Sequence, residues 1–355
     1  MLIEYEINAI GIIIDIFLIA LCCLNSTIDK NRRNGIFICA VLLFIVSTLA
    51  NIKSYIMNNN IYNTSIILTL IQSICFMITP MLPCLLLVNY TNVKIGYKIA
   101  FLVPIIVNFI LCIITNFTPI LFGFTNELLY VRGTLYIVPV IIACITLMFS
   151  LHYLATKANY LLLSDNIFLI VILSTSALCF LFERIFDFSY FFYNVSSVCL
   201  LVYFAAINGF ECRKDVLTKT FNRNYLESYL PKIEKKSAVL LMLDLNNLKK
   251  LNDSLGHLNG DMMIVKLAST LISCFGDKGR IFRYGGDEFL VVVTNYKYFD
   301  EIDDFIKRFN ELSKLEGISV AYGYSMYIPN ENTIESAIKE ADSNMYSFKR
   351  EMKVC

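Results

Sequence analysis

A glycine-hinged pair of carboxylates stands near the C-terminal end of the sequence. The stretch RYGGDEFLVVV (283–293) places two glycines before Asp287 and Glu288, and apolar, mostly β-branched residues follow. Glycines at such a corner allow positive φ angles and let a bulky ligand approach the backbone. A third carboxylate, Asp244, ends the apolar segment 237–245. Converging carboxylate oxygens are what hard divalent cations require, and such cations keep open positions for phosphates.

The segments around this corner predict a mixed α/β domain. Their order is β-α-α-β-β-α-β-α, with the two carboxylates in a hairpin between the second and third strands. The expected fold is a central, mainly antiparallel sheet flanked by helices. The predicted strands cover 237–245, 280–284, 288–293 and 318–327, and the predicted helices cover 246–275 with a break near Gly256, 305–312 and 333–352.

Taken alone, a Gly-Gly-Asp-Glu turn is usually only a turn, but three further segments accompany it. The four segments are DVLTKTFNRNYL (215–226), DLNNLKKLNDSLGHLNGD (244–261), RYGGDEF (283–289) and ADSNMYSFK (341–349). In this order and spacing they resemble the GGDEF family, the diguanylate cyclases, over residues 215 to about 353. The resemblance implies an enzyme that condenses two GTP into cyclic di-GMP and two pyrophosphates by two-metal phosphoryl transfer.

The resemblance also implies metal and catalytic residues. Asp244, the Leu245 carbonyl and Asp287, together with Glu288, would hold two Mg²⁺ ions, with Mn²⁺ as an alternative. Asp287 and Glu288 are the carboxylates expected to activate the 3′-hydroxyl, and Lys249 is the expected catalytic lysine that neutralises phosphate. Because each site binds one GTP, the resemblance implies a homodimer through this domain.

A second set of residues would bind the substrate. Asn252 and Asp261 would read the guanine edge, with His257 beside the nucleotide, and Asp261 would repel the ring-nitrogen acceptor of adenine. Two residues at the start of a helix can offer their backbone amides to phosphate oxygens, and two lysines near the C-terminal end would neutralise phosphates. These four residues are Asn247, Leu248, Lys349 and Lys353. Each residue also has a plain interpretation, such as a helix break at Gly256–His257 or a solvated Lys349.

Four positions depart from the family pattern. Lys219 and Thr220 replace the usual Gly-Leu, Asn246 replaces the second Asp of D-x-D, and Met352 stands where glycine is usual. The product-inhibition motif R-x-x-D is expected to be absent, because its window reads GDKG (276–279).

Two other functions stay open. One is a degenerate GGDEF module that binds nucleotide or a partner without catalysis. The other gives the N-terminal part its own activity, as a transporter or as a receptor for an unknown small ligand.

The N-terminal part has a different composition. Of the 30 Lys and Arg residues 9 precede residue 211, and of the 29 Asp and Glu residues 8 do. This sparse charge predicts a membrane-embedded domain over 1–210 and a soluble domain over 211–355. The near-zero net charge of the latter gives no case for nucleic acid. Seven spans are expected, near 7–24, 35–52, 65–88, 99–116, 134–153, 166–182 and 190–207, with six or eight as alternatives.

Basic residues in the loops indicate the orientation of these spans. With the N-terminus outside, Lys30, Arg32, Arg33, Lys94, Lys98, Lys157, Arg213 and Lys214 lie inside, and Lys53, Arg132 and Arg184 lie outside. This distribution predicts a multi-pass protein of the cytoplasmic (inner) cell membrane with a cytosolic GGDEF domain. The start MLIEYEINAIG lacks a basic n-region, so we expect a first span and not a removed signal peptide.

Several residues within the predicted spans are unusual. Asp15 lies in the middle of the first span, where it is either a ligand or ion contact or a protonated packing residue. Pro80 and Pro83 should kink the third span. Nine of the 12 cysteines lie in or beside the apolar runs without zinc-site spacing, and Cys212, Cys274 and Cys355 are expected to stay reduced.

Overall fold

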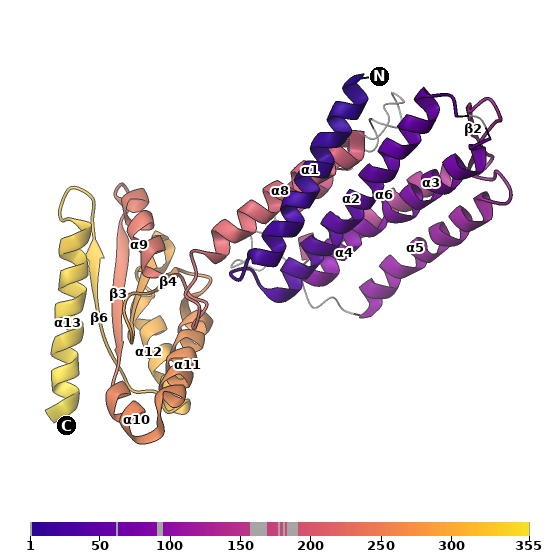
Figure 1. Ribbon diagram of the computed structural model, residues 1–355. Coiled ribbons are helices and arrows are strands. Elements are labelled where there is room, and N and C mark those ends of the chain that lie inside the picture. The colour runs from indigo at the N-terminus through magenta and orange to yellow at the C-terminus, as the bar shows by residue number, and fades with distance from the viewer. Residues whose placement is uncertain are drawn as a thin grey trace. The chain divides into compact units, whose positions relative to one another are not determined.

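The chain forms two compact units, Met1–Gly209 and Phe210–Cys355. The computed structural model describes residues 2–61, 63–90, 95–156, 169–176, 178–179, 182 and 191–354. Figure 1 shows helices alone in most of the first unit and a sheet with helices in the second. The boundary expected from composition, between residues 210 and 211, lies one residue from this division.

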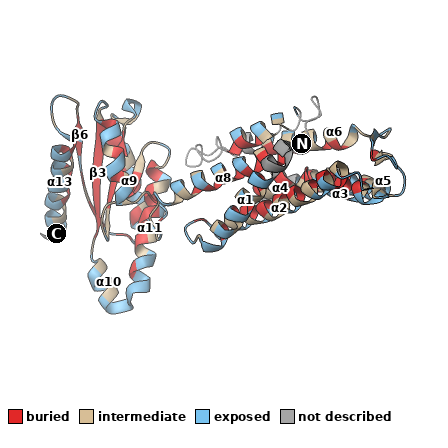
Figure 2. Ribbon diagram, turned by 45° about the horizontal axis from the view of Figure 1, so that its top comes forward, coloured by how far each residue is buried: buried red, intermediate tan, exposed pale blue. Residues whose placement is uncertain are grey.

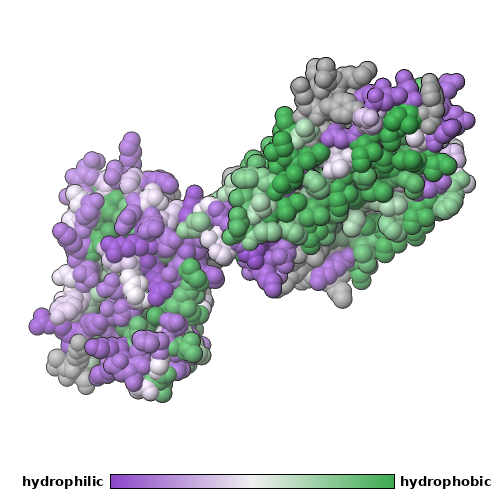
Figure 3. All heavy atoms as spheres, in the orientation of Figure 1, coloured by the Kyte–Doolittle hydropathy of each residue, from purple (hydrophilic) through white to green (hydrophobic). Residues whose placement is uncertain are grey.

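Long apolar helices build the first unit. They are α1 (Leu2–Leu24), α2 (Lys30–Asn58), α3 (Ser65–Ile78), α4 (Met81–Tyr90), α5 (Ile95–Thr115), α6 (Val138–Thr156) and α8 (Phe191–Glu211). Side chains on their outer faces are large and apolar, and Figure 3 shows a predominantly hydrophobic surface on this unit. The predicted sixth span, 166–182, is described only in part, at 169–176, 178–179 and 182, so the expected count of seven stays a prediction.

Within the described ranges, five helices are long and apolar enough to cross a membrane, judged by length and composition. Four belong to the first unit: α2, α3 with α4, α5 and α8. The fifth, α11 (His257–Phe275), belongs to the second unit, where its apolar face packs in the core of the sheet, so we assign it to that domain. The helical stretches Ala9–Leu24 and Val138–Tyr153 are apolar but shorter.

The third predicted span is broken at its first proline. Helix α3 ends at Ile78 and α4 begins at Met81, with Thr79 and Pro80 in a turn between them. Proline has no N–H for the helical ladder and its ring clashes with the preceding turn. The Thr79 hydroxyl donates to the Cys75 carbonyl at 2.9 Å and so satisfies one acceptor at the break. The expected kink is found at Pro80, whereas Pro83 lies within α4.

Helices α1 and α8 run in the same direction. Just past the C-terminal end of α1, the Asn25 amide and the Thr27 hydroxyl donate to Asn208 Oδ1 at 2.8 and 2.7 Å. A Cβ built on Gly11, in the middle of α1, would overlap with Asn194, near the start of α8. Both contacts join residues at matching heights of the two helices, which requires a parallel arrangement.

A small hairpin lies at the opposite end of this unit and was not predicted. Strands β1 (Phe122–Phe124) and β2 (Tyr130–Arg132) pair antiparallel. The Lys53 ammonium lies 5.2 Å from the centroid of the Phe124 ring and donates to Gln72 Oε1 at 2.6 Å. Two of the basic side chains expected outside, Lys53 and Arg132, therefore belong to this end.

The second unit is built on a four-stranded antiparallel sheet of order β4-β5-β3-β6. Its strands are β3 (Ala238–Leu245), β4 (Arg280–Arg283), β5 (Glu288–Val293) and β6 (Val320–Tyr327). Its helices are α9 (Arg223–Tyr229), α10 (Leu248–Leu255), α11, α12 (Ile302–Leu315) and α13 (Ile334–Val354), with 3₁₀ turns at Leu230–Ile233 and Tyr296–Tyr298. The predicted element order and the antiparallel sheet are confirmed.

Helices cover both faces of this sheet. Every residue of β3 is buried, and successive side chains point to opposite faces. Val239, Leu241 and Leu243 pack with α11 and α12, whereas Leu240 and Met242 pack with α9 and α13. Figure 2 shows this buried strand between exposed outer helix faces. The rigid sheet therefore holds the residue at the end of β3, Asp244, in a fixed position.

Candidate active site

Two carboxylates face each other across the central strands. In the register of β3 and β5, Asp244 pairs directly with Glu288. Directly opposed residues of an antiparallel pair place their Cβ atoms about 5 Å apart on one face of the sheet. Like charges in this position are destabilising, and Asp244 is 8% exposed. The fold therefore holds together two acids that repel each other unless a cation lies between them.

The turn that presents the acids begins one residue earlier than expected, at Tyr284. Strand β4 ends at Arg283 and β5 begins at Glu288, so Glu288 is the first residue of a strand. The Tyr284 amide donates to the Glu288 carbonyl at 2.8 Å and closes the turn. Positive φ angles among the described glycines occur at Gly256 and Gly317 alone, so the expectation for this corner was wrong.

The two glycines of the corner leave room for neighbouring groups and do not adopt a left-handed backbone conformation. A Cβ at Gly285 would lie 2.7 Å from the Glu288 carboxylate, whereas a Cβ at Gly286 would meet nothing within 4 Å. Gly286 is exposed, and this open space leaves its backbone accessible to a ligand. The glycine pair thus lets the Glu288 side chain fold back over the turn.

A lysine from the last helix reaches this acidic site. Lys349 Nζ, on α13, lies 2.5 Å from Asp244 Oδ1, and both side chains are largely buried. Burial raises the pKa of Glu288, and the neighbouring charges of Asp244, Asp287 and Asp342 raise it further, while Lys349 lowers it. The site therefore keeps an excess of negative charge even with the lysine in place.

The remaining expected metal ligands lie beside this pair. The Leu245 amide donates to the Asp287 carbonyl at 3.2 Å, which ties the end of β3 to the hairpin. Among the described residues no group of three His, Cys, Asp or Glu side chains is arranged as a complete metal site. The donor set nevertheless fits a divalent cation, because hard cations prefer carboxylate and carbonyl oxygens and complete their shells with water or phosphate.

The predicted guanine-reading asparagine, Asn252, lies in α10, just before the break that separates it from α11. Its Oδ1 atom is buried and has no hydrogen-bond partner within the described parts of the chain. A Cβ at Gly260 would overlap with the Asn252 amide, so this glycine makes room for it. Gly256 separates the two helices with φ 84°, a conformation that only glycine adopts easily. An unpaired buried acceptor is costly unless a ligand satisfies it.

The other predicted substrate residues lie around this break. His257 is the first residue of α11, and Asp261 is one turn later on the same helix; both are exposed. Lys249 is exposed in the first turn of α10. Asn247 caps that helix in a left-handed conformation, with φ 61° and no side-chain capping bond, so first-turn amides around Leu248 lack intrahelical partners. Lys353 lies in α13, but its side chain is outside the described part of the structure.

Two of the departures from the family pattern contact each other. The Asn246 amide nitrogen donates to Ser319 Oγ at 3.2 Å and to Met352 Sδ at 3.7 Å. Asn246 therefore faces the start of β6 and the end of α13, and Met352 covers it. Asp244, the acid expected to hold metal, is unaffected by this exchange.

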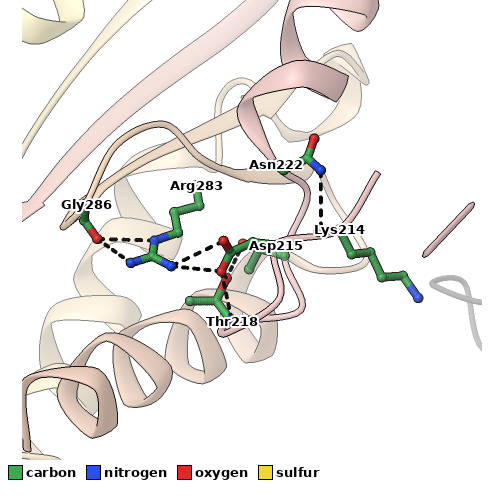
Figure 4. A network of polar contacts seen from close by, with 7 residues as sticks. Lys214, Asp215, Thr218, Asn222, Arg283 and Gly286 are labelled. Carbon is green, nitrogen blue, oxygen red and sulfur yellow. Dashed lines mark hydrogen bonds and ion pairs between the residues drawn. The ribbon is translucent and has the colours of Figure 1, made fainter. Parts of the chain in front are cut away.

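A polar network that the sequence did not reveal joins the carboxylate hairpin to the first turn of the second unit (Figure 4). Arg283 Nη1 lies 3.0 Å from Asp215 Oδ1, and Nη2 donates to the Gly286 carbonyl at 2.7 Å. Asp215 also accepts from the Thr218 amide and hydroxyl at 2.9 and 2.8 Å. Burial alone would raise the pKa of Asp215, but the hydrogen bonds from Thr218 and Arg283 outweigh it and lower that pKa.

The other two departures from the family pattern, Lys219 and Thr220, lie in the first turn of the second unit. Lys219 has φ 61°, the left-handed region in which a glycine is unstrained. Thr220 is buried, and its hydroxyl lies 2.8 Å from the Thr218 hydroxyl. Lysine thus occupies the glycine position of this turn at a conformational cost.

Comparison with known proteins identifies the second unit. Residues 213–355 match the model of a family described as "Diguanylate cyclase, GGDEF domain". The diguanylate cyclase DgcN of Escherichia coli K12 is 29% identical over 126 residues, 33% of this chain and 31% of that protein. The signaling protein YkoW of Bacillus subtilis 168 is 32% identical over 154 residues, 39% of this chain and 19% of that protein.

A solved microbial GGDEF domain, described for its interaction with cyclic di-GMP, is 30% identical. The match covers 39% of this chain and 94% of that chain, with a TM-score of 0.35. The chain thus aligns with a third or less of the length of the two curated relatives above. Residues 213–355, which include the sheet with its carboxylate corner, belong to the GGDEF domain family, whose members include the diguanylate cyclases.

Proposed function

We propose that the protein is a diguanylate cyclase, which condenses two GTP into cyclic di-GMP and two pyrophosphates. The observation that carries this proposal is the register of β3 and β5, which sets Asp244 against Glu288 with Asp287 adjacent. A degenerate domain would be expected to lose this pair first. Here both acids are present, and the raised pKa of Glu288 reflects burial and a surplus of negative charge that a cation would relieve.

Asp244, Asp287, Glu288 and the Leu245 carbonyl would hold Mg²⁺. The bound ions would neutralise phosphate charge and lower the barrier to attack on the α-phosphorus. Glu288 starts partly buried among other acids, so it is suited to accept a proton from the attacking hydroxyl. Lys349 holds Asp244 at 2.5 Å and lies within reach of phosphates bound at the same edge.

The guanine end of the substrate would bind between α10 and α11. Guanine offers N–H donors along one edge, and the buried Asn252 Oδ1 is an acceptor without a partner among the described residues. The exposed carboxylate of Asp261 adds a second acceptor on the neighbouring helix. Adenine has an acceptor where guanine has N1–H, so two acceptors favour GTP over ATP. His257 and Lys249 would complete the contacts.

Two such sites must meet for one product. Each domain would bind one GTP, and the two halves of cyclic di-GMP then come from two copies of the chain. The proposed working unit is therefore a homodimer through the GGDEF domain. We propose that the first unit anchors this domain in the cell membrane and controls the encounter of the two copies.

The proposed orientation places the N-terminus outside and the GGDEF domain in the cytosol. Helices α1 and α8 run parallel, as the contacts of Asn25 and Thr27 with Asn208 require. Parallel first and last spans are what an odd number of crossings produces. Arg33 donates to the Asn25 carbonyl at the proposed inner end, and Lys53 with the β1–β2 hairpin lies at the other end.

Nucleotide turnover by the full-length protein in nanodiscs tests the function. The protein is given GTP and Mg²⁺, and the product is identified by mass spectrometry. Wild type and Asp304→Ala, which changes an exposed acid on α12, should both release cyclic di-GMP, and Asp287→Ala should not. Bound GTP without turnover in the wild type would favour the non-catalytic module instead.

A further inference from the structure

A partly open cavity lies in the first unit, beside the break between α3 and α4. Its volume is about 110 Å³, and it is lined from α2, α4, α6, α8 and the helical stretch 169–176. Pro80 and Pro83 both contribute to its wall. The break therefore leaves a space that the surrounding side chains do not fill.

The wall of this cavity is apolar and belongs to the interior of the bundle. Cys39, Leu43 and Leu173 line it and are 1, 2 and 4% exposed. Its lining contains no Asp, Glu, Lys, Arg or His among the residues that the structure describes. A charged ligand would lose its hydration here without a partner, so the cavity excludes ions.

One hydroxyl in this wall is left without a partner. Ser196 on α8 is 8% exposed, and its Oγ atom has no hydrogen-bond partner in the described ranges. Two other hydroxyls of the wall are satisfied: Thr79 donates to the Cys75 carbonyl at 2.9 Å, and Thr146 donates to the Ala143 carbonyl at 2.9 Å. A buried unpaired hydroxyl is costly, and a ligand with one polar group would remove that cost.

We propose that this cavity is a binding site for a small neutral organic molecule that carries one hydroxyl or carbonyl group. Apolar cavities of about 150 Å³ bind benzene, and this smaller but partly open space suits a molecule of about five or six heavy atoms. The apolar body would fill the space beside Pro83, and the polar group would bond with Ser196. A lipid acyl chain could fill the space but would leave Ser196 unpaired.

Photolabelling of the full-length protein in nanodiscs tests the site without any nucleotide, so its outcome does not depend on the proposed cyclase activity. The probe is a diazirine analogue of butanol, and labelled peptides are mapped by mass spectrometry. Labelling should saturate and concentrate on the segments around Pro83, Ala143 and Ser196. Cyclopentanol should compete with the probe about fivefold better than cyclopentane, which is the effect of one hydrogen bond.

Two variants and one control make the test specific. Ser196→Ala should remove the fivefold difference between the two competitors while leaving the apolar space. Ala143→Phe should fill the cavity and abolish saturable labelling, whereas Ala205→Phe, on an exposed position of α8, should not. Labelling that rises without saturation, or a competitor preference that survives Ser196→Ala, would overturn the proposal and indicate lipid partitioning alone.

Discussion

Arg283 joins Asp215, in the first turn of the GGDEF domain, to the carbonyl of Gly286 at the tip of the carboxylate hairpin. Its Nη1 atom lies 3.0 and 3.2 Å from the two Asp215 oxygens, and its Nε and Nη2 atoms lie 3.2 and 2.7 Å from the Gly286 oxygen. One guanidinium thus fixes the hairpin relative to the start of the domain. The planar fork suits this task, because it serves two acceptors in different directions at once.

We expect Arg283→Lys to destabilise the domain by about 1–2 kcal/mol, since an ammonium cannot serve both acceptors with the same geometry. This loss should lower the Tm by about 3–6 °C for a domain of this size, measured by calorimetry of the full-length protein in nanodiscs. The control is Arg223→Lys, which changes an exposed pair with Glu227 and should shift the Tm by less than about 1 °C. Equal shifts in the two variants would contradict the assigned role.

The same contact predicts how stability depends on pH. Burial raises the pKa of Asp215, but the bonds from Thr218 and Arg283 outweigh it, so the net pKa lies below the ordinary value. A carboxylate with a depressed pKa stabilises the fold above about pH 4, its pKa in the unfolded chain, and this contribution is lost as the pH falls through its folded pKa. Wild type should therefore lose its advantage in Tm over Asp215→Asn on acidification below about pH 4. A constant difference at all pH values would exclude Asp215 as the group responsible.

The local sequence pattern was enough to predict the sheet and the positions of Asp244 and Glu288. It was not enough to predict the contacts that hold the carboxylate hairpin in place. The buried run before Asp244 and the apolar run after Glu288 are readable in sequence, and their pairing follows from a short hairpin. Arg283 and Asp215 are 68 residues apart, and no periodicity relates them. The β1–β2 hairpin was not predicted for a related reason: each strand has three residues, too few to show a clear alternation of apolar and polar side chains.

Lys219 shows what a departure from the family pattern costs. Its φ of 61° brings Cβ close to a carbonyl oxygen, which costs roughly 1 kcal/mol in any residue but glycine. Lys219→Gly should therefore raise the stability of the domain by up to about 0.5 kcal/mol, after the greater freedom of glycine in the unfolded chain is subtracted. Lys219→Ala, which keeps the Cβ, should leave the Tm nearly unchanged. Stabilisation by alanine as well would instead point to a charge effect.

Glu288 should contribute to activity at the expense of stability. Burial raises its pKa, followed by the charges of Asp244, Asp287 and Asp342, so the folded state favours its protonated form. The penalty for ionising it appears as the pH rises through its folded pKa. At neutral pH, Glu288→Gln should therefore raise the Tm slightly, by an amount equivalent to about 0.5 kcal/mol after allowance for solvent screening, while cyclic di-GMP formation is lost.

Magnesium provides the control for this prediction. Added Mg²⁺ should raise the Tm of the wild type more than that of Glu288→Gln, because a carboxylate ligand is missing in the variant. Glu311→Gln, at an exposed position of α12, should behave as wild type in both respects. A variant at position 288 that is less stable than wild type without magnesium would show that the acids are not in conflict.

Gly260 should govern recognition of guanine through Asn252. A Cβ at this position would overlap with the Asn252 amide, so Gly260→Ala must displace that side chain. The helix itself should persist, because alanine is the better helix former. GTP should then bind about ten- to a hundredfold more weakly, the cost of one lost bond to a buried acceptor. ITP, which lacks the exocyclic amino donor of guanine, should lose less. Isothermal titration with both nucleotides measures the difference, and an unchanged preference for GTP over ITP would place the amino group away from Asn252.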